Sequence, residues 1–112
     1  MPYLTITSNQ VLDTDSSQLN MLSKTVSESL GKPETYVMVS FTHNPNMLFA
    51  GSNDPLAYCE LKSLGLHESQ TADLSKRLCN SLHHFYGIHP SRVYIEFSAP
   101  ARAMWGWDNK TF

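Results

Sequence analysis

The sequence repeats its pattern after 56 residues, which is half the length of the 112-residue chain. Under this shift Gly31 aligns with Gly87, and helix-like and strand-like apolar patterns align with each other. The aligned apolar pairs are Leu22 and Leu78, Val26 and Leu82, Leu30 and Tyr86, Val37 and Val93, Val39 and Ile95, and Phe41 and Phe97. This recurrence predicts that one structural unit occurs twice, at about residues 1–56 and 57–112.

Each half predicts a strand, a helix and a second strand. Residues 3–7 alternate in polarity, residues 19–30 carry apolar side chains at helical spacing, and residues 36–41 alternate again. Gly31 followed by Pro33 predicts the end of the first helix. The corresponding segments of the second half are a strand at 58–64, a helix that ends at Gly87 and a strand at 93–97.

Polar side chains before each helix are typical of helix caps. The first helix has a run of capping residues before it: Asp13, Thr14, Asp15, Ser16 and Ser17. Ser69 or Thr71 is expected to cap the second helix.

Two βαβ units with right-handed crossovers assemble most simply into one four-stranded mixed sheet with both helices on a single face. The predicted fold is therefore an α+β two-layer sandwich. Its bare sheet face would carry Tyr36, Met38 and Tyr94, together with Leu4 or Tyr3. Because this face is too apolar to lie comfortably in water, we expect a homo-oligomer.

The composition, with 41% apolar and 16% charged residues, is that of a single soluble globular domain spanning residues 1–112. A net charge of -2 without a basic stripe argues against nucleic acid or an anionic membrane as a partner. No transmembrane run or signal region is evident, so the cytoplasm is the default location, and release by a route without a signal peptide stays open. Cys59 and Cys79 form no C-x-x-C pair and are interpreted as small apolar fillers.

The chain opens with Met1-Pro2 directly before the first strand. If the methionine is removed, Pro2 becomes a free secondary amine, which can take up a proton or attack a carbonyl. The alternative interpretation is structural, because proline is a normal first residue of an edge strand.

Several short motifs occur in an order that resembles the macrophage migration inhibitory factor family of the tautomerase superfamily. The matching segments are Met1-Pro2, Gly31-Lys32-Pro33, Phe49-Ala50-Gly51-Ser52, Leu61-Lys62-Ser63-Leu64-Gly65, Pro90-Ser91-Arg92-Val93-Tyr94-Ile95 and Gly106-Trp107-Asp108-Asn109-Lys110-Thr111-Phe112. The resemblance spans the whole chain. It implies a homotrimer with an active site at each subunit boundary. It also implies tautomerisation of small aromatic α-keto acids such as phenylpyruvate, or of dopachrome-type substrates, without metal or cofactor.

The resemblance implies catalysis by Pro2 as base and acid, which requires a neutral amine at rest. Burial and a nearby cation favour that form, and Lys32 fits as the cation and as the partner of the substrate carboxylate. Leu64 would form a pocket wall and offer its backbone amide to the substrate. Both residues also have a structural interpretation. Lys32 is placed favourably at a helix C-terminus, and Leu64 could be an ordinary core leucine.

The C-terminal half supplies the remaining substrate-binding residues that the resemblance implies. Tyr94 would come from the neighbouring subunit, and Glu96 lies on the same strand face. Glu96 departs from the amide side chain of the best-known family members, and a carboxylate there would raise the pKa of Pro2 and repel an anionic substrate. Trp105, Trp107 and Phe112 would form an aromatic rim, unless they only seal a subunit contact. Trp105 is larger than the usual aliphatic residue and would narrow the mouth.

Two functional classes therefore compete: a phenylpyruvate or dopachrome tautomerase, and a cytokine-like signalling or interaction protein with weak or vestigial turnover. The five histidines show no metal-ligand spacing, so we expect no metal and no cofactor. Leu56-Ala57-Tyr58-Cys59 stands where the best-known family member has a C-x-x-C pair, so we expect no thiol oxidoreductase activity.

Overall fold

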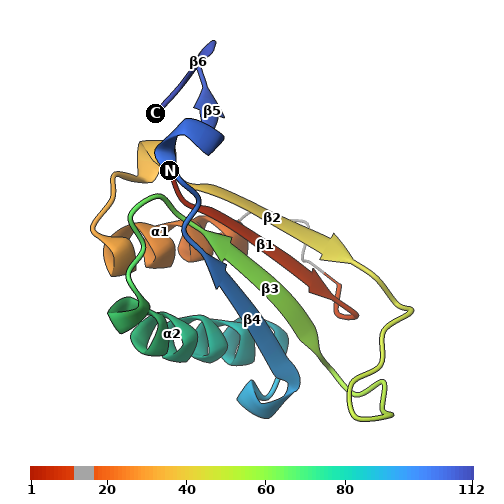
Figure 1. Cartoon of the computed structure of the whole chain (residues 1–112). Helices are drawn as coiled ribbons and strands as arrows, with labels where there is room; N and C mark the ends of the chain where they lie inside the picture. The colour runs from red at the N-terminus through yellow and green to blue at the C-terminus, as the bar shows by residue number, and fades with distance from the viewer. Residues whose placement is uncertain (12–16) are drawn as a thin grey trace.

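The computed structural model describes residues 1–11 and 17–112, and in it two helices cover one face of a four-stranded sheet (Figure 1). The strands follow the order β2-β1-β3-β4 across the sheet. The elements are β1 (Tyr3–Ser8), α1 (Ser17–Leu30), β2 (Met38–His43), β3 (Ala57–Lys62), α2 (Glu68–Tyr86) and β4 (Val93–Ser98). The predicted fold, two βαβ units in one mixed sheet, is confirmed.

The two halves join through their first strands. Within each half the strands run parallel, β1 beside β2 and β3 beside β4. Between the halves β1 and β3 run antiparallel, with Tyr3 opposite Lys62 and Ile6 opposite Cys59. The start of β1 therefore lies beside the end of β3.

The core lies between the sheet and the helices. Alternate strand residues, such as Leu4 and Ile6 of β1, point toward the helices and are buried, as period-two alternation requires. The sequence pattern left open whether Leu4 or Tyr3 faces away from the helices. The structure places Leu4 in the core, and the hydroxyl of Tyr3 lies 3.1 Å from that of Ser40 on the opposite face.

Both helices end at the predicted glycines, but α2 does not begin at a predicted capping residue. Gly31 and Gly87 have φ values of 63° and 67°, the left-handed conformation that ends a helix. The predicted caps Ser69 and Thr71 are wrong, because α2 begins at Glu68 after His67. The Gln70 side chain accepts a hydrogen bond from the His67 amide at 2.9 Å and so satisfies this helix start. The caps predicted at positions 13–16 lie outside the described residues.

The alternating pattern predicted that Tyr36 belongs to β2, but the structure places it before that strand. It ends a short 3-10 helix, η1 (Glu34–Tyr36), in which its amide donates to the carbonyl of Pro33 at 3.1 Å. This turn carries Tyr36 past the end of the sheet, so that it does not extend the bare face. The strand predicted at 58–64 likewise ends earlier, at Lys62.

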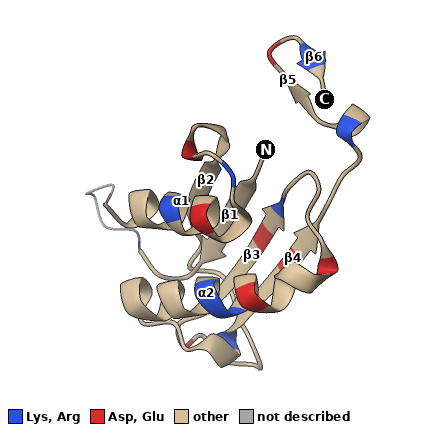
Figure 2. Ribbon diagram, turned by 90° about the vertical axis from the view of Figure 1, so that its left-hand side faces the viewer, with Lys and Arg blue, Asp and Glu red and all other residues tan. Residues whose placement is uncertain are grey.

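No helix or strand of residues 1–11 and 17–112 covers the sheet face opposite the helices (Figure 2). Met38 and Tyr94 on this face are 63% and 66% exposed. Figure 2 also shows charges of both signs scattered over helices and strands, without a single-sign stripe. Neither helix of the described chain is long and apolar enough to cross a membrane.

The C-terminal segment projects beyond the end of the sheet (Figure 1). It contains a 3-10 helix, η3 (Arg102–Met104), and a small hairpin of β5 (Gly106–Trp107) and β6 (Lys110–Thr111). Asp108 and Asn109 form the two-residue turn with φ values of 52° and 63°. These residue types tolerate positive φ well, so the hairpin is encoded locally.

We expect Leu78→Ala in α2 to lower the free energy of unfolding by about 2–5 kcal/mol, because it opens a cavity in the core. Leu78 is 2% exposed. Chemical denaturation at one protein concentration measures the change. Lys76→Ala, an exposed position on the same helix, is the control. Equal losses in the two variants would contradict the assigned core face of α2.

Candidate active site

A hollow of about 760 Å³ opens where the two ends of the chain meet, beyond the end of the sheet. Met1 and Phe112 both line it. Lys32 and Leu64, two of the predicted site residues, line it as well. We call this hollow the terminal cavity.

Pro2 lies directly behind Met1 at the start of β1. Its side chain is fully buried, and its carbonyl accepts a hydrogen bond from the Met38 amide at 3.0 Å. While Met1 is attached, the nitrogen of Pro2 is a tertiary amide without a basic lone pair. Removal of Met1 would turn this anchored nitrogen into a free amine, next to the position where Met1 lines the cavity.

The backbone of Lys32 is held by the exit of α1. Its amide donates to the carbonyl of Ser27 at 3.0 Å, and the Ser27 hydroxyl donates to the Lys32 carbonyl. At the tip of the side chain, Nζ donates to the carbonyl of Leu64 at 3.0 Å. The ammonium group is therefore fixed between the end of α1 and the end of β3.

The amine of Met1, at the N-terminus, has a pKa below its ordinary value of about 8. Burial is the larger cause, because it disfavours the charged form, and the positive charge of Lys32 is the second. Both effects favour a neutral amine at neutral pH. This amine belongs to Met1, whereas the predicted chemistry uses the amine that Pro2 would gain if Met1 were removed.

Leu64 closes one side of the terminal cavity. Its side chain is 6% exposed, and its carbonyl holds Lys32. The Leu64 amide donates to no other group in residues 1–11 and 17–112. One backbone donor of a cavity-lining residue is thus without a partner in the described part of the chain.

Aromatic side chains from two segments meet at the cavity. Phe112 lines it and stacks on Trp107, with ring centroids 5.8 Å apart and an interplanar angle of 13°. Tyr36 also lines it and meets Trp107 edge to face at 6.1 Å. The C-terminal hairpin is thereby held against η1.

Pro2, next to Met1, and Trp107, stacked on Phe112, do not line the terminal cavity themselves, and three further predicted site residues lie elsewhere in the single chain. Trp105 lines a separate hollow of about 450 Å³ with Tyr3 and Lys62. Tyr94 and Glu96 project from the bare face of β4. Both residues have contacts on this face. The centroid of the Tyr94 ring lies 4.7 Å from that of the Phe49 ring, and Glu96 accepts a hydrogen bond from the Tyr58 hydroxyl at 2.7 Å.

Tyr36 and Arg102 are among the lining residues that the sequence analysis did not assign to the site. Tyr36 was assigned to the bare sheet face because it continues the alternation of β2. Arg102 stands in a segment without helical or strand periodicity, and no local signal connects it to Lys32. The aromatic rim predicted from the C-terminus was the only signal that this segment reaches the site.

With this geometry established, the chain was compared with known proteins. A family model described as macrophage migration inhibitory factor (MIF) matches residues 1–112. The chain belongs to the macrophage migration inhibitory factor family. The resemblance predicted from the short motifs is confirmed.

Named relatives support the MIF assignment over most or all of the chain. The Mus musculus macrophage migration inhibitory factor is 37% identical over 95 residues, which cover 84% of this chain and 83% of that protein. The Brugia malayi homolog is 36% identical over 118 residues, which cover 100% and 99%.

Solved MIF structures share the fold. The homologue from Prochlorococcus marinus superposes with a TM-score of 0.93 at 37% identity and covers 98% of each chain. The protein from Trichinella spiralis gives a TM-score of 0.91 at 32% identity, with 98% of this chain and 99% of that chain covered. The MIF family includes tautomerases, so membership supports isomerase activity at the level of the family.

None of the residues that line the terminal cavity is a cysteine or a histidine. Burial raises the pKa of Cys59 to about 12, and burial also raises that of Cys79, so both thiols are poor sources of thiolate at neutral pH. Within residues 1–11 and 17–112, no group of three or more His, Cys, Asp or Glu side chains is placed to hold a metal ion.

We expect Lys32→Gln to raise the pKa of the terminal amine, because one of the two causes that lower it is removed. Only the neutral amine reacts with an acylating reagent. The midpoint of the labelling rate against pH should therefore move to higher pH, measured by mass spectrometry of the N-terminal peptide. Lys24→Gln, an exposed position on α1, should leave the midpoint in place. An unchanged midpoint in Lys32→Gln would show that the two charges do not interact.

Proposed function

We propose that this protein is a cofactor-free tautomerase that interconverts keto and enol forms of phenylpyruvate-type or dopachrome-type substrates, with Pro2 as the base and acid. The observation that supports this most strongly is the position of Lys32. Its ammonium group is bound to the Leu64 carbonyl at 3.0 Å, and after burial its charge is the second cause that lowers the pKa of the Met1 amine. We propose that both causes act in the same direction on the amine of Pro2 once Met1 is removed. A neutral amine and a cation that can bind a carboxylate thus face one cavity.

The reaction follows from this arrangement. After removal of Met1, the neutral amine of Pro2 takes a proton from the carbon next to the keto group. The electron pair of that C–H bond forms a new C=C bond, and the π pair of the C=O bond moves to the oxygen. The protonated amine then returns a proton to this oxygen and completes the enol. Lys32 stabilises the negative charge that develops on the substrate.

The remaining cavity residues would hold the substrate. Lys32 would bind its carboxylate, and the unpartnered amide of Leu64 would donate a further hydrogen bond. Phe112 and Tyr36 offer ring faces and edges to an aromatic group. We propose that a small aromatic α-keto acid fits this combination.

We further propose that the site is completed by assembly into a homotrimer. The bare sheet face exposes Met38 and Tyr94, and the family fold points to an oligomeric assembly. Tyr94 does not reach the terminal cavity of its own chain. It would serve the cavity of a neighbouring subunit by offering its ring and hydroxyl.

A signalling or interaction role is the second candidate function, and Glu96 favours it. Its carboxylate lies on the exposed face beside Tyr94, where it holds the Tyr58 hydroxyl and raises the pKa of Tyr58 to about 12. If this face meets the neighbouring cavity, the carboxylate would repel an anionic substrate. Tautomerase turnover would then be weak or vestigial.

We expect Pro2→Gly to lower the rate of phenylpyruvate tautomerisation by about 100-fold or more, because the positioned base is lost. Ultraviolet absorbance of the enol, with phenylpyruvate and its 4-hydroxy analogue, measures the rate. Intact mass must first show that Met1 is absent. Pro90→Ala, at the start of the remote 3-10 helix η2 (Pro90–Arg92), is the control. Equal rates in Pro2→Gly and the parent protein would exclude the role assigned to Pro2, and no turnover by the parent would favour the interaction role.

We expect light scattering at low concentration to give three times the 12.6 kDa mass of the chain. Met38→Glu should shift the mass toward the monomer, because it places a charge on the bare sheet face. Met21→Glu changes an exposed methionine of α1 and should leave the mass unchanged. A monomeric parent protein would rule out a site shared between subunits.

A further inference from the structure

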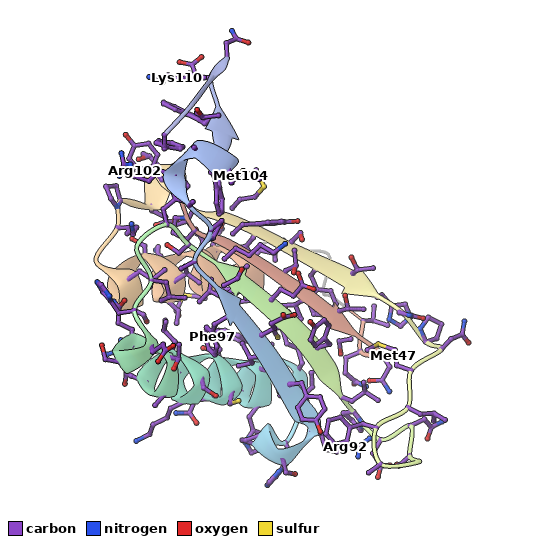
Figure 3. The ribbon with its side chains drawn as sticks, in the orientation of Figure 1. Met47, Arg92, Phe97, Arg102, Met104 and Lys110 are labelled. Carbon is purple, nitrogen blue, oxygen red and sulfur yellow. The ribbon has the colours of Figure 1, made fainter. Side chains whose placement is uncertain are left out.

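Arg102 approaches the terminal cavity from the C-terminal side. It begins η3, just after the chain leaves β4, and Figure 3 shows it at the end of the sheet where the N-terminus lies. The residue lines the cavity together with Lys32. In residues 1–11 and 17–112, its guanidinium group has no ion pair and no hydrogen-bond partner.

The charged side chains that line the cavity are all of one sign. Two cations line it, and none of its lining residues is an Asp or Glu. The nearest acidic residue along the chain from Lys32 is Glu34, whose carboxylate accepts a hydrogen bond from the Ser23 hydroxyl at 3.1 Å. The lining of a single chain thus carries two cationic side chains against one negative charge, the terminal carboxylate of Phe112, which forms no ion pair within residues 1–11 and 17–112. This excess of positive charge attracts anions.

The two cations differ in how they are held. Lys32 is bound to the Leu64 carbonyl beside the amine at the N-terminus, so its charge lies at the reacting end of the cavity. Arg102 comes from a different segment and is unengaged. A planar guanidinium group can form two parallel hydrogen bonds to one carboxylate, a geometry that an ammonium group does not offer.

We propose that Arg102 binds a second anionic group of the substrate, so that the cavity prefers aromatic 2-oxo acids with a further carboxylate on the ring to the corresponding monoacids. The 2-oxo carboxylate would bind Lys32, the ring would lie against Phe112 and Tyr36, and the ring carboxylate would bind Arg102. This preference rests on the proposed tautomerase function and names its substrate class.

Two probes test the preference, 4-carboxyphenylpyruvate and phenylpyruvate, which differ only in the second carboxylate. In the parent protein, kcat/KM should be about tenfold or more higher for the diacid, since one charge-assisted pair of hydrogen bonds is worth about that factor. Arg102→Gln should remove the difference by lowering the diacid value while leaving the monoacid value nearly unchanged. Arg102→Lys should keep part of it, because the charge remains and the paired geometry is lost.

The control variant is Arg77→Gln, which removes one positive charge from the exposed face of α2, where Arg77 pairs with Asp73. It should leave the ratio of the two substrates unchanged. Equal kcat/KM values for diacid and monoacid in the parent protein would overturn the second anion site. An equal fall for both substrates in Arg102→Gln would overturn it as well, because it would indicate a general effect on the cavity.

Binding of unreactive acids separates this site from the proposed reaction. Calorimetry with 4-carboxycinnamate and cinnamate, neither of which can tautomerise, should show about tenfold tighter binding of the diacid, and Arg102→Gln should abolish the difference. If this binding is seen without turnover of either phenylpyruvate, the tautomerase function fails and the second anion site stands. If turnover occurs but both acids bind equally, the second anion site fails alone.

Discussion

The antiparallel pairing of β1 with β3 is the contact on which the rest of the molecule depends. Neither βαβ unit can cover its own apolar strand face completely, and the pairing joins both faces into one core. Its register also places Tyr3 opposite Lys62. Pro2 at one end of this pair therefore lies close to Leu64 at the other, so the contact that completes the core also brings the N-terminus to the cavity.

The internal repeat explains why only one end of the sheet carries the proposed chemistry. Pro2 corresponds to Tyr58 under the shift of 56 residues, and only Pro2 can become a chain terminus with a free amine. Lys32 corresponds to Ile88, which is fully buried. At that second helix exit, Arg92 donates hydrogen bonds to four carbonyls of the β2–β3 connection and cannot bind a ligand with the same groups. The helix exit of the second half therefore fixes the β2–β3 connection through Arg92, whereas the helix exit of the first half places Lys32 at the terminal cavity.

Parts of the site could be predicted from sequence to different degrees. Pro2, Lys32 and Leu64 belong to motifs whose order resembles the family, and the structure brings Lys32, Leu64 and the end of the chain to one cavity, with Pro2 directly behind the lining residue Met1. Tyr36 was missed because its alternation with Val37 is identical to that of a strand, although the chain there forms a 3-10 turn. Arg102 was missed because its segment has no period, and its distance from Lys32 depends on the whole sheet.

The sequence by itself determined the repeated order of strands and helices, the core face of each element and the glycine exits at Gly31 and Gly87. These features depend on side chains within a few positions of each other, so local periodicity encodes them. Only the tertiary structure decided that Lys32, Leu64 and Arg102 line one cavity while Trp105 and Tyr94 do not. That division depends on sheet register and on the path of the chain beyond the last strand, which are set by long-range packing rather than by local pattern.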